Sequence, residues 1–190
     1  DFSDTLRYVA DRAGVQLRPP TEEEKAAAEE NEGLREILEE ALIFYRHQLK
    51  NSPRGLETLE YLHNRRNLND QTIESFGLGY APDSWESTIQ HFQRKGYQDA
   101  DILACGLASE RDTGGLYDRF RNRLMLPIRD ARGRMAGFGA RVLDPEDMPK
   151  FLNSPQTVLF DKSRLLYGLD RARKAIRTLE QVVIVEGYLD

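Results

Sequence analysis

The 190-residue sequence contains a single cysteine, Cys105, and this scarcity excludes two kinds of framework. One thiol cannot build an internal disulfide network or a cysteine-rich zinc site. The sequence also has no apolar run near the roughly 20 residues that span a bilayer, and its start lacks the basic and apolar regions of a secretory signal. We therefore expect a protein of a reducing, intracellular compartment with no membrane segment.

Acidic side chains outnumber basic ones overall, but not in the second part of the chain. The net charge of −5 argues weakly against a nucleic-acid partner when the sequence is taken whole. Residues 1–110 hold 21 acidic and 12 basic side chains, whereas residues 111–190 hold 11 acidic and 15 basic ones. This asymmetry indicates a polyanion as a partner of the second part.

Composition and length indicate a soluble globular fragment. Hydrophobic residues make up 39% and charged residues 31% of the chain, and 190 residues suffice for one core plus the start of a second. The chain lacks an initiator methionine and stops just after the β-branched run Val182–Val185. We interpret it as a piece of a longer protein.

Residues 1–110 are predicted to be mainly helical. Ser52 followed by Pro53 is a capping residue with a first-turn proline, and the apolar residues of 34–49 fall on one face at helical spacing. The acidic, alanine-rich residues 21–33 are interpreted as a solvated helical start or linker. Helices are predicted over 3–13, 34–49, 53–64, 70–76, 84–96 (with Trp85 on it) and 98–104, with a short strand over 78–80.

Residues 111–190 are predicted to contain strands. The runs 124–129 and 134–142 flank a turn signal, Asp130–Gly133, and are typical of a hairpin. Pro127 cannot donate a hydrogen bond to a ladder, so its strand is expected to lie at an edge or to be bulged. The segments expected after the hairpin are an irregular polar one over 144–164, a helix over 168–179, and a strand over Val182–Val185 buried on both faces of a parallel sheet.

Arginines concentrate in and around the predicted hairpin, with eight arginines and three aspartates between positions 111 and 141. Arg119, Arg121 and Arg123 alternate, so an extended segment would point all three to one face. The planar fork of arginine suits phosphate, and such a row predicts an electrostatic track for a nucleic-acid backbone. The alternative is a solvated strand face with ordinary salt bridges.

Two further features suit either ligand contact or ordinary structure. Gly137 and Gly139 occupy alternate positions in a predicted strand, where glycine marks a structural bulge or a close approach of a ligand to the backbone. The loop that follows presents Lys150, Asn153 and Lys162 to phosphate or base, although asparagine before Ser-Pro is also ordinary turn chemistry.

Glu186 directly follows the predicted strand Val182–Val185. Ligand chemistry in open α/β sheets collects at the carboxyl ends of strands, so a carboxylate there suits metal binding or general acid–base work. A lone glutamate after a strand is also compatible with a surface residue without function. The histidines fall on predicted helices without ligand spacing, and we interpret them as structural or surface residues.

Taken together and in this order, these segments resemble the catalytic core of bacterial DnaG-type DNA primases. The resemblance covers nearly the whole chain, and the ordered set of motifs is strongly specific. The matching segments are Leu42–Tyr45, Leu78–Pro82, Tyr117–Arg123, Pro127–Asp130, Gly133–Arg141, Pro149–Pro155, Leu166–Leu169 and Val185–Asp190.

The resemblance implies an α+β fold in two parts. A helix-rich N-terminal subdomain with a basic β-hairpin would cover residues 1–165, and the first αβ unit of a TOPRIM subdomain would cover 166–190. The family activity is that of a DNA primase, a nucleotidyltransferase that acts as a DNA-directed RNA polymerase and makes short RNA primers on single-stranded DNA during replication. We expect this piece alone to bind single-stranded DNA weakly and not to polymerise.

The resemblance also implies roles for individual residues. Glu186 matches the TOPRIM glutamate, implied to be the acid–base residue and a metal ligand, and Asp190 matches the acidic residue that closes this motif. Arg119 and Arg121 match a template-facing groove. The residues that match a basic ridge for phosphates and template are Arg66, Arg141, Lys150, Asn153 and Lys162. Departures from the family pattern are Phe151 for a frequent tyrosine, Ala140 for glycine, Asp161 where many members have histidine, and Leu189 for methionine.

Cofactors and partners follow from the same resemblance. It implies Mg²⁺ or Mn²⁺ at the acidic motif, and Zn²⁺ only in a zinc-binding domain outside this chain. Glu186 alone cannot hold Mg²⁺ tightly, since that ion needs further carboxylates or phosphates, and the Asp-x-Asp ligands of the family would follow Asp190. Implied partners are a single-stranded DNA template, ribonucleoside triphosphates and, through a C-terminal domain outside this chain, the replicative helicase, in the bacterial cytoplasm at the nucleoid.

Two alternatives stay open. One is a non-catalytic module that binds single-stranded nucleic acid. The other is a different TOPRIM enzyme, such as a topoisomerase or nuclease, against which the arginine-rich hairpin and the loop over 149–155 count.

Overall fold

The computed structural model describes residues 2–16, 18–144 and 146–189, and the chain divides into two compact units, residues 1–32 and 33–190. The first unit contains helix α1 (Phe2–Ala13) and the beginning of helix α2 (Glu22–Asn51). In the described ranges, no helix combines the length and the apolar character that a bilayer span requires.

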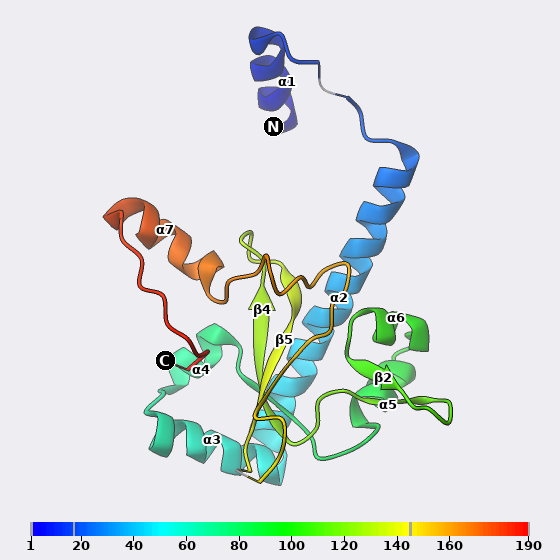
Figure 1. Cartoon of the computed structure of the whole chain (residues 1–190), viewed down its shortest axis with the longest axis vertical. Helices are drawn as coiled ribbons and strands as arrows, with labels where there is room; N and C mark the ends of the chain where they lie inside the picture. Colours follow the sequence, from blue (N-terminus) through cyan, green and yellow to red (C-terminus); the bar gives the residue numbers. More distant parts are fainter. Residues whose placement is uncertain (1, 17, 145, 190) are drawn as a thin grey trace. The chain divides into compact units, whose positions relative to one another are not determined.

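The second unit mixes helices with antiparallel strands (Figure 1), which confirms the predicted α+β class. After α2 its elements are α3 (Pro53–Arg66), α4 (Asp70–Phe76), β1 (Gly79–Ala81), α5 (Ser87–Arg94), α6 (Asp99–Ala104), β2 (Ala108–Glu110), β3 (Leu116–Asp118), β4 (Arg123–Arg129), β5 (Met135–Val142), β6 (Phe151–Asn153) and α7 (Leu169–Leu179).

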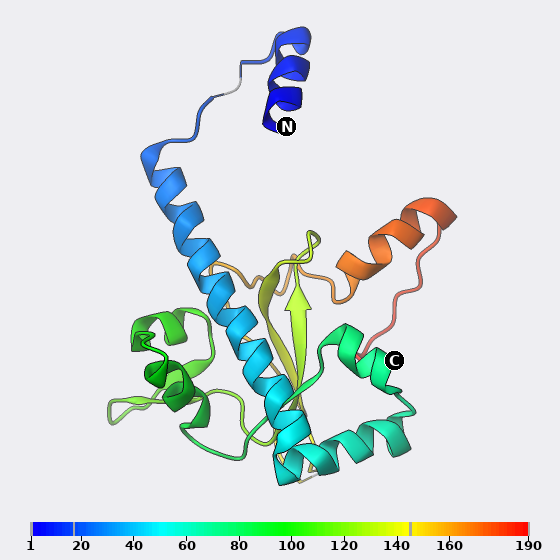
Figure 2. The ribbon, with the colours of Figure 1, turned by 180° about the vertical axis from the view of Figure 1, so that it is seen from behind.

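Helix α2 covers one face of the main sheet, as Figure 2 shows for the β4–β5 hairpin behind it. Its apolar residues recur at helical spacing, and Leu38, Ala41 and Tyr45 are fully buried. Tyr45 packs edge-on against Phe138 of β5, with ring centroids 5.4 Å apart. Burial of this apolar face, at about 25 cal/mol per Å², is the main term that holds the helix on the sheet.

Local capping signals set the next two helices. The Ser52 hydroxyl accepts a hydrogen bond from the N–H of Gly55 at 3.1 Å, which caps α3 as its sequence predicts. The helix runs two residues beyond the predicted end, because Asn67 caps it with a left-handed φ of +53°. Helix α4 ends at Phe76 and is capped by Gly77, whose φ of +67° suits glycine, in agreement with the prediction.

The main sheet has the strand order β1-β4-β5-β6, and all of its pairs are antiparallel. The predicted β4–β5 hairpin is confirmed, and β4 is an interior strand of the sheet only along residues 123–125. Pro127 is tolerated because β1 pairs only with residues 123–125 of β4. The expected bulge is confirmed by a register shift between Ile128 and Arg129.

Asp118, the last residue of β3, joins the small β2–β3 sheet to α5. Its buried carboxylate accepts hydrogen bonds from the N–H groups of Thr88 at 2.7 Å and Ile89 at 3.0 Å. This cap from another part of the chain makes α5 begin at Ser87. The predicted start near position 84 is therefore wrong, and Trp85 lies outside the helix.

Arg119, Arg121 and Arg123 do not form one extended row. The backbone turns between β3 and β4, and Asn122 has a φ of +47°, which breaks the two-residue alternation of a strand. Arg123 is only 7% exposed and donates to the carbonyl of Pro149 at 2.7 Å. The prediction that all three arginines point to one face is wrong.

The run Val182–Val185 is not a strand in the part of the chain that the structure describes. It pairs with neither sheet, and each of its residues is at least 55% exposed. β-Branched residues favour a strand only where a neighbour supplies packing and a hydrogen-bonding ladder, so the predicted buried strand is wrong here. The helix before it, α7, is confirmed, whereas the predicted irregular segment 144–164 contains the short strand β6.

Candidate nucleic-acid interface

The edge of the main sheet carries two cations around an aromatic ring. Arg141 of β5 lies opposite Phe151 of β6 in the strand register, and its guanidinium carbon is 5.1 Å from the centroid of the Phe151 ring. The Nζ atom of Lys150 is 5.8 Å from the same centroid. We call these three residues the Phe151 cluster. Phe151 is 43% exposed, so the cluster offers both a π face and positive charge, the features that bind single-stranded nucleic acid.

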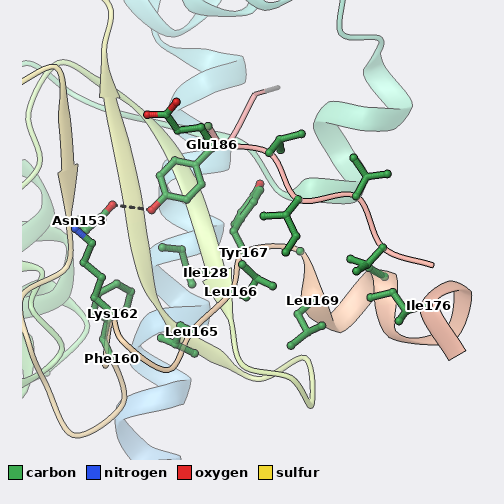
Figure 3. Close-up of a pocket in the computed structure, with 18 residues that line it drawn as sticks. Ile128, Asn153, Phe160, Lys162, Leu165, Leu166, Tyr167, Leu169, Ile176 and Glu186 are labelled. Atoms are coloured by element: carbon green, nitrogen blue, oxygen red, sulfur yellow. Dashed lines mark hydrogen bonds between the residues drawn. The ribbon is translucent and has the colours of Figure 1, made fainter. Parts of the chain in front are cut away.

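Asn153, the last residue of β6, connects this strand to the segment that carries Glu186. Its side-chain oxygen accepts a hydrogen bond from the Tyr188 hydroxyl at 2.9 Å, drawn as the dashed line in Figure 3. Its main-chain carbonyl accepts from the Nε and Nη2 atoms of Arg119 at 3.2 and 3.0 Å. Burial lowers the pKa of Arg119. The two hydrogen bonds from its guanidinium to Asn153 hold strand β6 in place.

Side chains from other parts of the chain pack directly against Gly137 and Gly139 of β5. A β-carbon at Gly139 would lie 2.7 Å from the Tyr188 ring. At Gly137 it would lie 2.8 Å from both the Phe160 ring and the Ser154 hydroxyl. The glycines are needed for the packing of these side chains, whereas the register shift lies beside Gly137, between Ile128 and Arg129 of β4, and the approach of a ligand stays a prediction.

A pocket of about 280 Å³ lies between the sheet, α7 and the C-terminal segment. Three of the predicted site residues line it: Asn153, Lys162 and Glu186. Figure 3 shows Asn153 and Lys162 on one side and the apolar residues Leu169 and Ile176 of α7 on the other. The Glu186 side chain is exposed, so its carboxylate is accessible to a ligand from solvent.

A divalent metal does not fit the described residues by themselves. Among them, no group of three or more His, Cys, Asp or Glu side chains is placed to hold an ion. Glu186 is the carboxylate among the residues that line the pocket, and the predicted partner Asp190 lies outside the described residues. Because Mg²⁺ demands an octahedral set of oxygens, Glu186 alone does not constitute a metal centre.

A second group of cations and rings surrounds Trp85, and of its members the sequence predicted a site role for Arg121 but not for Trp85 or Arg111. Trp85 is 56% exposed. The guanidinium carbon of Arg121 lies 4.0 Å from the Trp85 centroid and 5.3 Å from that of Tyr117, and Arg111 lies 5.5 and 5.6 Å from the same rings. We call these four residues the Trp85 cluster. The available signal was the turn-forming segment Pro82–Ser84 just before the tryptophan, which argues against a helix there.

The structure therefore separates the predicted site residues into groups. Arg66 lies at the end of α3, where its Nε donates to the Tyr61 hydroxyl at 2.7 Å and its guanidinium stacks over that ring. The remaining residues fall into the Phe151 cluster (Arg141, Lys150), the pocket (Asn153, Lys162, Glu186), the support of β6 (Arg119) and the Trp85 cluster (Arg121).

Comparisons with known proteins agree with one another. Residues 44–173 match the family described as "DNA primase catalytic core, N-terminal domain". The chain is 43% identical over 190 residues to the DNA primase of Deinococcus radiodurans, an alignment that covers 100% of this chain and 31% of that protein.

Two solved structures have the same fold. The RNA polymerase domain of Mycobacterium tuberculosis primase DnaG matches with a TM-score of 0.75 and 36% identity, over 83% of this chain and 50% of that one. The DnaG primase catalytic domain bound to ssDNA matches with a TM-score of 0.69 and 37% identity, over 78% and 45%. The chain thus spans about a third of its curated relative and about half of each solved domain.

Proposed function

The chain belongs to the family of the N-terminal domain of the DNA primase catalytic core, and on this premise we propose that it forms the template-binding part of a bacterial DNA primase. The whole protein would be a DNA-directed RNA polymerase that makes RNA primers on single-stranded DNA from ribonucleoside triphosphates. The observation that carries the proposal is the Asn153–Tyr188 hydrogen bond, which joins the strand of the Phe151 cluster to the Glu186 segment.

The template is assigned to the Phe151 cluster. Arg141 and Lys150 attract backbone phosphates, and the exposed ring of Phe151 stacks on a base. A DnaG catalytic domain of similar fold has been solved bound to ssDNA, which supports a single-stranded template. The Trp85 cluster offers a second ring and further cations of the same kind.

The acid–base role is assigned to Glu186, with Asp190 in the same motif. Lys162 lines the same pocket as Glu186, so a triphosphate there would meet a cation and a carboxylate. Mg²⁺ or Mn²⁺ would need ligands in addition to the described residues. Four points remain predictions from the family resemblance. They are the boundary of a TOPRIM subdomain at 165/166, a zinc-binding domain outside this chain, the replicative helicase as a partner, and location in the cytoplasm.

Primer synthesis by the full-length protein tests the enzymatic part. Glu186→Gln should lower the rate by a factor of about 100 or more, because a positioned acid–base group contributes that much. Affinity for single-stranded DNA should stay unchanged. Glu180→Gln makes the same change at the exposed cap of α7 and should keep wild-type activity. Full primer synthesis by the Glu186→Gln protein would favour the alternative, a module that only binds nucleic acid.

A further inference from the structure

Five exposed cations gather where the turn of the β4–β5 hairpin meets α7. Arg132 lies in the turn, and Arg134 directly follows it. The other three cations belong to α7 and are Arg173, Lys174 and Arg177. Figures 1 and 2 both show the tip of the hairpin beside this helix. We call these five residues the α7 patch.

Arg173 fixes the two elements against each other, since its Nη1 donates to the main-chain carbonyl of Ala131 in the turn. Arg173 and Arg177 are four residues apart and share one side of the helix. Together with Lys174 they line a shallow hollow of about 320 Å³, which Asp170 and Thr178 complete. The hollow is therefore lined by three cations of one helix, of which Arg173 also contacts the turn.

Carboxylates neutralise only part of this charge. Asp130 is already engaged, because it accepts from the Nε of Arg134 at 3.0 Å and from the N–H of Arg132 at 2.8 Å. Asp170 lies in the hollow itself. Among the described residues, Arg132, Lys174 and Arg177 form no salt bridge, and these three cations supply the excess positive charge that a polyanion-binding surface requires.

The α7 patch is distinct from the Phe151 cluster. Strand β5 runs from Met135, beside the turn, to Val142, next to Arg141, and contains eight residues. At about 3.3 Å per residue the two surfaces are roughly 20–25 Å apart, more than the Debye length of about 8 Å at physiological salt. Salt therefore screens the charges of the α7 patch from DNA bound at the Phe151 cluster. The patch has to contact its ligand directly.

We propose that the α7 patch is a second binding site for the phosphate backbone of the single-stranded DNA held at the Phe151 cluster. This inference rests on the proposed function, because the DNA bound at Arg141 and Lys150 is the ligand that reaches the patch. Four of the five cations are arginines, whose planar fork pairs with phosphate. The hollow, as described, is lined without an aromatic ring, so the contact is to the backbone and independent of sequence.

The test is DNA binding by the variant R132A/K174A/R177A, which keeps Arg173 and its contact with the turn. Fluorescence anisotropy with labelled oligo(dT) of about 30 nucleotides measures affinity across a salt series. Loss of three phosphate contacts should lower the slope of log affinity against log salt by about 2 and weaken binding about tenfold at low salt. The control R54A/R65A/R94A removes three exposed cations elsewhere and should behave as wild type.

If the patch variant keeps the wild-type affinity for DNA and the wild-type salt slope, the inference is overturned. This is also the result expected if the patch binds an acidic protein instead of DNA. The variant R141A/K150A distinguishes a failure of the α7 patch from a failure of the proposed function. If it binds weakly while the patch variant binds normally, only the α7 patch is wrong. If R141A/K150A also binds as wild type, the proposed function itself fails.

Discussion

The guanidinium carbon of Arg121 lies 4.0 Å from the centroid of the Trp85 ring, and a single residue holds the two together. The N–H of Asp118 donates to the carbonyl of Trp85 at 2.7 Å, and the carbonyl of Asp118 accepts from Nη1 of Arg121. Because Trp85 is the single tryptophan of the sequence, its fluorescence reports on this surface alone.

Single-stranded DNA should change the Trp85 emission. Saturating oligo(dT) should quench the fluorescence, because a base stacked on the ring replaces water there. Arg121→Ala should weaken binding by about 1 kcal/mol, about fivefold, through loss of the stacked cation. Arg94→Ala, an exposed change on α5, should have no effect. Unchanged emission at saturation would show that the DNA passes elsewhere.

Removal of the Asp118 carboxylate should destabilise the fold. Asp118→Ala leaves the buried N–H groups of Thr88 and Ile89 without their acceptor, which should cost about 2–4 kcal/mol in the free energy of unfolding. Burial raises the pKa of Asp118, so Asp118→Asn, which keeps one acceptor oxygen without the buried charge, should cost less. Urea denaturation measures both, with Asp112→Ala in the exposed neighbouring turn as the control. A loss as small as that of the control would contradict the capping role.

Gly139→Ala should disturb Tyr188. A methyl group there overlaps the ring, which should cost about 1–3 kcal/mol in unfolding free energy. In a Tyr188→Ala background most of this cost should disappear, because the overlapping ring is gone. Gly33→Ala is the control, since no atom lies within 4 Å of its added β-carbon, and it should stabilise helix α2 by up to about 1 kcal/mol. An equal cost of Gly139→Ala in both backgrounds would show that Tyr188 is not the obstacle.

Glu40 should make stability depend on pH in the acid range. Burial alone would raise the pKa of Glu40, but hydrogen bonds from Lys95, which caps α5, and from His91 of that helix outweigh it and hold the pKa below the usual 4.5. The unfolded state therefore takes up the proton first, so the stabilisation is complete above pH 4.5 and is lost as the pH falls through the folded-state value.

Thermal unfolding across pH 3–7, roughly the range in which carboxylates titrate, measures this effect. The Tm difference between wild type and Glu40→Gln should be full near neutral pH and shrink below pH 4.5. A difference that stays constant down to the lowest pH would contradict the assignment.

Elements with local signals were predictable from the sequence. Ser52 followed by Pro53 predicts the start of α3, and Asp130–Gly133 predicts the hairpin turn. In both cases the hydrogen bonds that decide the structure join residues within four positions of each other. Such contacts form whatever the rest of the chain does, so the sequence carries them directly.

Features decided by distant residues were not predictable in this way. The start of α5 depends on Asp118, which lies 30 positions after Thr88. The three alternating arginines point in different directions because two of them bind distant carbonyl groups. Arg119 donates to the carbonyl of Asn153, and Arg123 donates to the carbonyl of Pro149. The resemblance to a family singled out Asn153, Lys162 and Glu186, but only the packing of α7 and β6 shows that they share a pocket.

Binding of single-stranded DNA by R141A/K150A tests the central claim, that the Phe151 cluster holds the DNA backbone. Anisotropy of labelled oligo(dT) is measured from low to physiological salt for wild type, this variant and the matched control R65A/R94A. Each phosphate contact contributes about 0.7 to the slope of log affinity against log salt, so the slope should fall by about 1.4 and the affinity by about tenfold at low salt. The control should follow wild type. A variant whose slope and affinity equal those of wild type would contradict the claim.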